Sequence, residues 1–289
     1  MNIIRKIGQK ILYLKRCYHW YECYKKYCVL PRRDNYIEDI SWLNEGRILL
    51  IAPHADDELL SSYSLLTKAK NIVVYYCGFT GSNHEESNRI IRKNEIEAVC
   101  KNLNIPIFDG CGACYNLKEV LTAENFKSIV IPSIVDWHPE HRKVSYILYN
   151  IMKEINITPK IYSYSVTVPN ESKRKISCVP LTKVEFKKKY ELFKRIYKSQ
   201  LFMPLYRFKI NERINGYNIN MYAAEVFCYY ELNEWKENTL VFMSAESVND
   251  KRLIEMSISL GESLGNLEEL RILSSNMYHC FENRELFYG

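Results

Sequence analysis

The chain has 289 residues, 26% of them charged and 47% hydrophobic, and a net charge of +6. This length suits one large α/β domain or a domain with appendages, and the composition is ordinary for a globular protein with a sizeable core. The modest charge, without a basic-aromatic RNA motif, predicts no nucleic-acid partner. Ten cysteines without a secretory signal predict free thiols, so we expect a cytoplasmic protein.

Residues 1–30 predict a basic amphipathic helix within an N-terminal extension of residues 1–36. Its apolar residues recur at helical spacing on one stripe, made of Ile4, Ile7, Ile11, Leu14, Tyr18 and Tyr21. Lys and Arg decorate the rest, and no apolar run reaches the ~20 residues of a membrane span. Two interpretations are open. The helix lies on the anionic inner face of a membrane, or it packs on the following domain, which the Tyr-rich stripe slightly favours.

The core domain is expected at residues 37–235, and two of its predicted strands end in polar side chains. Residues 48–51 form an apolar run that Pro53 should end, because proline has no N–H for a sheet ladder. Residues 128–135 form a second, β-branched run. The polar groups that follow the two runs are His54, Asp56, Asp57 and Glu58, and then Asp136, His138, Glu140 and His141.

Other elements alternate around these two strands. We expect helices at residues 58–69 and 85–104 and strands at 71–77 and 106–108. This alternation predicts an α/β, Rossmann-like fold with a mostly parallel, doubly wound sheet. Because the sequence contains neither a P-loop nor a G-x-G-x-x-G motif, we do not expect the sheet to bind a dinucleotide.

Beyond residue 160 the pattern is less regular. Residues 161–166 alternate like a strand, and Thr182 with Glu185 forms a capping-box signature for a helix that ends near Gln200. Residues 221–231 are aromatic and predict a late edge strand. Residues 236–289 form a C-terminal extension with some helical patterning and no readable chemistry.

The polar groups at the two strand ends predict a metal site. In an open parallel sheet, ligands bind at the carboxyl ends of strands. The chain has only six His, and three of them follow these two strands. Zinc sites with an open position use three His, Asp or Glu ligands and a water. His54, Asp57 and either His138 or His141 would complete such a set. A helix start would explain the acidic residues by itself, but it would not explain His54.

The same residues carry a resemblance to a known family. His54-Ala55-Asp56-Asp57-Glu58 resembles the His-Pro-Asp-Asp-Glu motif of the PIG-L/LmbE family of zinc-dependent de-N-acetylases. His138-Pro139-Glu140-His141 resembles that family's His-Pro-Asp-His motif, and the match covers roughly the middle two-thirds of the chain. Ala55 and Glu140 depart from the family pattern, but neither departure falls on a metal ligand.

The resemblance implies a role for each residue. His54, Asp57 and His141 would bind one zinc ion, although iron or cobalt would suit the same ligands. Asp56 would act as the general base, and His138 would stabilise the oxyanion and protonate the leaving amine. Asp136 or Glu140 would orient a catalytic histidine. Arg92 and Asp109 would contact the substrate.

The resulting prediction is an enzyme, a metal-dependent amide hydrolase. It would remove an acetyl group from an N-acetylglucosamine-type amino sugar and release acetate and a free amine. The carrier of the sugar stays open and includes lipid-linked and nucleotide-linked forms. The alternative is a catalytically silent sugar-binding or nucleotide-binding protein of the same fold. Intact Asp56 and His138 argue against silence, and the missing phosphate loop argues against nucleotide binding.

Overall fold

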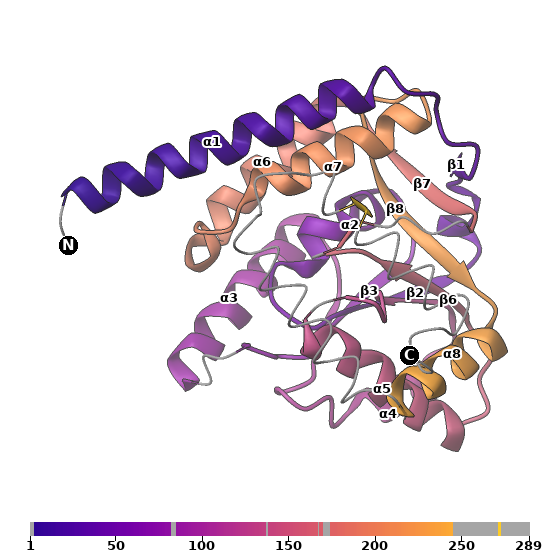
Figure 1. Cartoon of the computed structure of the whole chain (residues 1–289). Coiled ribbons are helices and arrows are strands. Elements are labelled where there is room, and N and C mark those ends of the chain that lie inside the picture. Colours follow the sequence, from indigo (N-terminus) through magenta and orange to yellow (C-terminus); the bar gives the residue numbers. More distant parts are fainter. Residues whose placement is uncertain are drawn as a thin grey trace.

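The strand predicted at residues 48–51 is β2 (Arg47–Ala52), and it lies inside a large mixed sheet (Figure 1). The computed structural model describes residues 3–81, 85–136, 138–166, 168–169, 174–244 and 271–272. Within these residues, eight strands form one sheet in the order β1-β7-β8-β6-β5-β2-β3-β4.

Five neighbouring strands of this sheet are parallel, as predicted. They are β6 (Lys160–Tyr164), β5 (Phe126–Pro132), β2, β3 (Ile72–Tyr76) and β4 (Ile107–Asp109). The crossover helices between them are α2 (Asp57–Lys68), α3 (Glu86–Leu103), α4 (Leu117–Ala123) and α5 (Pro139–Glu154). The predicted doubly wound arrangement is therefore confirmed. The second predicted strand, at residues 128–135, ends at Pro132, three residues earlier than expected.

The rest of the sheet differs from the prediction. Strand β8 (Ala223–Tyr230) is antiparallel to both β6 and β7 (Ile176–Leu181), and β1 (Tyr36–Glu38) pairs with the far side of β7. The prediction of an edge strand at residues 221–231 is wrong, because β7 and β1 lie beyond β8. The error has a physical cause: β7 contains Pro180, which weakens the strand signal of residues 176–181.

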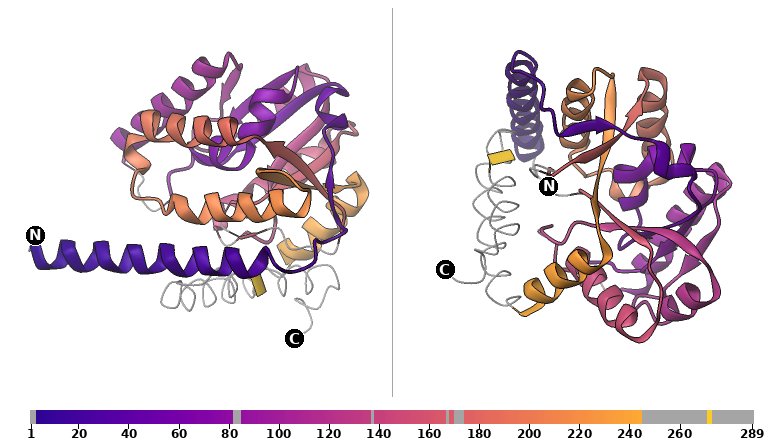
Figure 2. Two further views of the ribbon diagram at one scale, coloured as in Figure 1. Left: turned by 90° about the horizontal axis from the view of Figure 1, so that it is seen from above. Right: turned by 90° about the vertical axis from the view of Figure 1, so that its right-hand side faces the viewer.

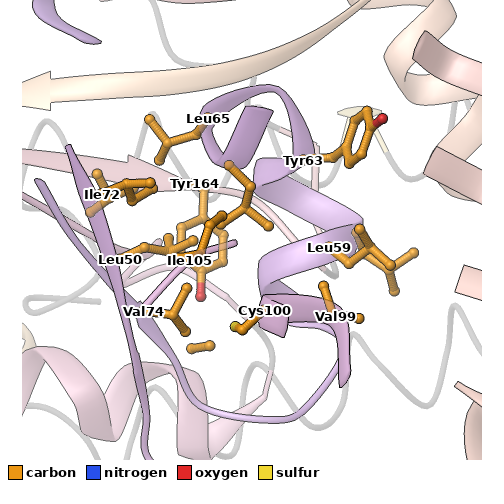
Figure 3. Packing of buried hydrophobic residues seen from close by; sticks show 14 of the residues in the cluster. Leu50, Leu59, Tyr63, Leu65, Ile72, Val74, Val99, Cys100, Ile105 and Tyr164 are labelled. Atoms are coloured by element: carbon orange, nitrogen blue, oxygen red, sulfur yellow. The ribbon is translucent and has the colours of Figure 1, made fainter. Parts of the chain in front are cut away.

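Side chains alternate between two buried faces along β2. Ile48, Leu50 and Ala52 point into a core shared with α2, α3 and α6, whereas Leu49 and Ile51 point into a core shared with α4, α5 and α8. Figure 3 shows Leu50 and Val74 of the sheet facing side chains from α2 and α3. Because both faces are covered, the strand is apolar at every position from Ile48 to Ala52 and shows no alternation with polar residues there.

Of the remaining helices, one begins at the predicted capping box and two were not predicted. Thr182 and Glu185 form the expected capping box at the start of α6 (Lys183–Ile196), which continues into the short 3-10 helix η2 (Lys198–Gln200). Helix α7 (Leu205–Asn218) and helix α8 (Leu232–Ser244) had no clear sequence signal. A 3-10 helix, η1 (Ser41–Asn44), places Trp42 in the core.

The predicted N-terminal helix is α1 (Ile3–Tyr27), which lies along α7 (Figure 1). The predicted domain boundaries fall inside elements, since β1 spans residue 36 and α8 spans residue 235. The division into three parts stays a prediction, and most of the proposed C-terminal extension lies outside the described residues. Among the described helices, none combines the length and the apolar character that a membrane crossing requires.

Candidate active site

The two predicted motifs meet at one end of the sheet. Strands β2 and β5 are parallel neighbours, with Leu50 opposite Val130. Their carboxyl ends therefore lie side by side, so the segment after Ala52 and the segment after Pro132 approach one another. Helix α2 begins directly after the first segment, and α5 begins directly after the second. His54 and Asp57 come from the β2 side of this meeting point, and His138 and His141 come from the β5 side.

Three ligand-type atoms converge here. His54 Nδ1 lies 3.2 Å from Asp57 Oδ2 and 3.0 Å from His141 Nε2, and His141 Nε2 lies 3.3 Å from Asp57 Oδ2. All three side chains are buried. Ligands at the usual zinc distances in a tetrahedral shell are separated by roughly 3.3 Å. The three atoms therefore have the mutual spacing of ligands around one ion.

In each of these two histidines, the other ring nitrogen, which we call the outer nitrogen, lies close to a carboxylate. His54 Nε2 lies 2.7 Å from Glu140 Oε2, and His141 Nδ1 lies 3.0 Å from Asp136 Oδ1. The backbone N–H of Gly81 also donates to Glu140 Oε2 at 2.9 Å. If the outer nitrogens carry the protons, the inner nitrogens present lone pairs toward the Asp57 carboxylate. Three acceptors that face one point are suited to a cation, and paired outer nitrogens are usual for metal-bound histidines.

His54, His138 and His141 form a second, wider set of possible ligands. Each of them offers one nitrogen, and these nitrogens all lie within 4.8 Å of one another. The set that contains Asp57 is tighter and includes a negative charge. We therefore regard His54, Asp57 and His141 as the better match to a zinc, iron or cobalt ion, because nitrogen and oxygen ligands suit all three metals.

Asp56, the neighbour of Asp57, has a different charged partner. Its backbone has φ 133°, a conformation that an L-residue rarely adopts. Asp56 Oδ2 lies 3.3 Å from Arg92 Nη2, which also donates to the carbonyl of Ala55 at 2.9 Å. Burial and the adjacent Asp57 carboxylate raise the pKa of Asp56 to about 7. The strained turn thus points the two adjacent carboxylates at different partners.

Arg92, a predicted substrate contact, lies beside the site through its contacts with Asp56 and Ala55. Glu95, on the same helix, accepts hydrogen bonds from the backbone N–H and the hydroxyl of Ser199, at 2.8 and 2.5 Å. Asp109, at the end of β4, pairs with Lys93 at 2.7 Å and accepts from the backbone N–H of Cys111. It lines a small surface pocket with Arg89 and has no recorded contact to the histidines among the described residues.

His138 caps α5 and lies against both other histidines. Its ring centre is 4.5 Å from that of His54 and 5.0 Å from that of His141. Its Nδ1 accepts the backbone N–H of Glu140 at 3.3 Å, so the neutral ring carries its proton on Nε2. Burial and the neighbouring imidazoles lower the pKa of His138 to about 4. A Cβ at position 81 would lie 3.9 Å from Nε2, so Gly81 leaves room beside this nitrogen.

Glu58 and Tyr197 also lie beside the site, although the sequence predicted no role for either residue. Glu58 is fully buried and accepts a hydrogen bond from the Tyr197 hydroxyl. Its other oxygen accepts the backbone N–H of Asp56 at 3.1 Å. Burial raises the pKa of Glu58 to about 8. The position of Glu58 directly after Asp57 was a signal, but its tyrosine partner is far away in the sequence and could not be inferred.

Comparisons with known proteins support the fold. No protein-family model and no curated protein matches the sequence. Among solved structures, the zinc-inhibited form of teicoplanin deacetylase is 14% identical and covers 64% of this chain and 97% of its own, with a TM-score of 0.51. N,N'-diacetylchitobiose deacetylase from Pyrococcus horikoshii is 16% identical and covers 64% of this chain and 84% of its own, with a TM-score of 0.50.

A third structure, a complex of a deacetylase from the biosynthesis pathway of teicoplanin, is 15% identical and covers 65% of this chain and all of its own, with a TM-score of 0.51. At this level of identity the likeness shows the fold alone. The chain therefore has the α/β fold of these deacetylases. This is the fold that the resemblance to the PIG-L/LmbE family predicted.

Proposed function

We propose that the protein is a member of the PIG-L/LmbE family and a metal-dependent amide hydrolase. It removes an N-acetyl group from an N-acetylglucosamine-type amino sugar and releases acetate and a free amine. The observation that carries the proposal is the convergence of three buried acceptor atoms, His54 Nδ1, Asp57 Oδ2 and His141 Nε2, within 3.0–3.3 Å of one another. The fold shared with two named deacetylases supports the same class of reaction.

In this proposal His54, Asp57 and His141 would hold one divalent ion, with zinc as the first candidate and iron or cobalt as others. The ion would polarise the amide carbonyl and lower the pKa of a bound water to about 7. Glu140 and Asp136 hold the outer nitrogens of His54 and His141, which fixes the orientation of both rings. This assignment differs from the sequence prediction, in which these carboxylates oriented a catalytic histidine.

Asp56 and His138 perform the proton transfers. Asp56 takes a proton from the attacking water, and Arg92 keeps its carboxylate in place. His138 carries its proton on Nε2, from which it can stabilise the oxyanion and protonate the departing amine. Arg92 and Asp109 stay proposed substrate contacts, and Arg92 in addition positions Asp56. Because both proton-transfer residues are intact, we favour an enzyme over a silent binding protein.

The substrate class is part of the proposal, and the comparisons support it. The neighbouring structures are deacetylases of the teicoplanin pathway and of N,N'-diacetylchitobiose. We propose an N-acetylated amino sugar for this chain, with a lipid-linked or nucleotide-linked carrier as a variant of the same chemistry. We also propose that the protein acts in the cytoplasm, as its cysteine content predicts.

The test combines metal analysis with an acetate-release assay. We expect the purified protein to hold one equivalent of a divalent metal and to release acetate from N-acetylglucosamine or N,N'-diacetylchitobiose. A chelator should abolish release, and one equivalent of zinc, iron or cobalt should restore it. Added metal should be kept near one equivalent, because one neighbour has a zinc-inhibited form. Absence of bound metal after growth with each of the three ions would contradict the proposal.

A further inference from the structure

Helix α1 uses one face to pack on the rest of the protein. This packed face consists of Trp20, Tyr24 and Tyr27, which cluster with Ile210 and Ile214 of α7. Trp20 is only 1% exposed. Arg213 donates to the Tyr24 hydroxyl at 2.8 Å. The interpretation of α1 as a helix packed on the following domain is therefore correct for this face, although none of these residues belongs to the predicted apolar stripe.

The predicted stripe instead faces solvent. Its described members, which we call the exposed stripe, are Ile7, Ile11, Leu14, Tyr18 and Tyr21, and they are 54, 61, 57, 62 and 51% exposed. The exposed stripe lies about 140° around the helix from the packed face, at ~100° per residue. Figures 1 and 2 show α1 as a straight helix whose N-terminal end projects past the start of α7. Single exposed apolar residues are normal, but a continuous stripe of five marks an interaction surface.

The charge of α1 indicates what kind of partner the exposed stripe would meet. Residues 3–27 contain seven Lys or Arg and one acid, Glu22, which gives 7 − 1 = +6. The whole chain has 40 basic and 34 acidic residues, which also gives 40 − 34 = +6. The other residues therefore carry 33 charges of each sign and are neutral in sum. The entire net charge of the protein lies in the helix that carries the exposed stripe.

This concentration of charge favours an anionic partner over a second copy of the chain. Pairing two copies through the exposed stripes would bring two helices of charge +6 together, and like charges oppose such a contact. By helical spacing, Lys10 flanks the stripe on one side, and Lys15 and Lys26 flank it on the other. Basic residues on both sides of an apolar stripe are typical of helices that lie in the interface of an anionic bilayer. Tyr18 and Tyr21 also suit the level of the headgroups.

We propose that α1 binds an anionic lipid surface through the exposed stripe while its packed face holds the α/β domain. The helix would lie parallel to the membrane plane over ~37 Å, at about 1.5 Å per residue. This attachment would be peripheral, since the helix lies along the membrane surface and does not cross the bilayer. The two predicted interpretations of α1 thus apply to different faces of one helix. The proposal does not depend on the proposed hydrolase activity.

The test measures binding of the full chain to vesicles by co-sedimentation. We expect binding to vesicles that contain phosphatidylglycerol or phosphatidylserine, little binding to phosphatidylcholine alone, and weaker binding as salt increases. The double variant Ile11→Asp/Leu14→Asp should weaken binding at least about tenfold, because it removes buried apolar area and adds negative charge. The variant Lys10→Glu/Lys15→Glu/Lys26→Glu should lose binding to the anionic vesicles.

A matched control is Val184→Asp on α6, which also places a charge at an exposed apolar position, 62% exposed, outside α1. It should bind like the unmodified chain. Because the substituted side chains are exposed, all variants should keep the same unfolding temperature. Equal binding to neutral and anionic vesicles would overturn the proposal, as would no binding to either. A dimer in solution that the Ile11→Asp/Leu14→Asp variant disrupts, without vesicle binding, would assign the stripe to a second copy instead.

Discussion

Asp56 and Asp57 are neighbours in the sequence, but their side chains have different environments. Asp57 lies between His54 and His141, whereas Asp56 lies beside Arg92. The positive φ of Asp56 makes this divergence possible. The proposed metal ligand, Asp57, and the proposed base, Asp56, are therefore adjacent residues with different contacts. The two roles can be tested independently.

Asp56→Asn should retain the metal and lose about 10²- to 10⁴-fold in turnover, because the amide cannot accept the proton. His141→Ala should lose metal and turnover together, because it removes a ligand. The measurement is metal content by elemental analysis beside the rate of acetate release. Near-normal turnover of Asp56→Asn at full metal occupancy would falsify the assignment of the base.

Glu140 reaches two parts of the site with one carboxylate oxygen, His54 Nε2 and the N–H of Gly81. Glu140→Gln keeps an acceptor oxygen but removes the charge, so we expect metal affinity to fall about 10- to 100-fold. Competition with a chelator of known affinity measures this change. The control is Glu154→Gln on the same helix, where the side chain is 60% exposed and pairs with Lys118. Equal affinities in the two variants would show that Glu140 does not support the metal.

At the scale of elements, α2 is broken at Ser62, where the backbone has φ −139° and ψ 22°. The break leaves backbone groups without helical partners, and two buried charges satisfy them. Glu225 of β8 accepts the backbone N–H groups of Tyr63 and Ser64 at 3.0 and 2.6 Å. Lys189 of α6 donates to the carbonyl of Leu60 at 2.7 Å and pairs with Glu225 at 2.5 Å. The pair therefore connects α6 and β8 to the helix that begins with Asp57.

Lys189→Met should destabilise the fold by about 3–5 kcal/mol, because it leaves the buried Glu225 and Glu212 carboxylates without their cation. Lys187→Met on the same helix is the control, since that side chain is 76% exposed and lies 3.7 Å from Glu191. An exposed pair of this kind contributes about 0–1 kcal/mol. Urea unfolding of both variants gives the comparison. If the two variants unfold at the same urea concentration, the buried pair is not what holds the broken helix.

At the scale of the whole molecule, α1 is attached through a small cluster that is separate from the two large cores. Trp20 and Ile214 are its buried members, and the aromatic rings of Trp20 and Tyr206 meet edge to face at 5.7 Å. The two faces of the sheet have their own, larger clusters. We therefore expect α1 to come away from α7 before the α/β domain unfolds.

Trp20→Ala should release α1 without unfolding the domain, because it removes the main buried side chain of the attachment. The seven Lys and Arg residues of α1 then become accessible, and trypsin should remove the N-terminal segment faster than in the unmodified chain. Mass spectrometry of a digestion series measures both the cleavage sites and the surviving fragment. Tyr21→Ala, at a position that is 51% exposed, serves as the control and should be cleaved at the original rate. Unchanged cleavage in Trp20→Ala would argue for further attachment of α1.

The sequence alone determined the parts of this protein that local pattern can specify. The apolar run at residues 48–51 and its polar successors predicted both a buried strand and a site at its end. The alternation of strands and helices predicted the parallel sheet, and Thr182 with Glu185 predicted the start of α6. Each strand, helix or cap signal is carried by residues within a few positions of one another, so no knowledge of the fold was needed to detect it.

The tertiary structure brings together residues that are far apart in the sequence. It placed β8 inside the sheet, paired Arg92 with Asp56, set Glu225 and Lys189 at the break in α2, and chose which face of α1 packs on α7. These contacts join residues that are tens of positions apart. A hydrophobic period identifies an apolar face, but it does not show whether another part of the chain covers that face. For α1 the regular stripe stayed outside, because α7 offered a partner for the tryptophan and tyrosines on the other face.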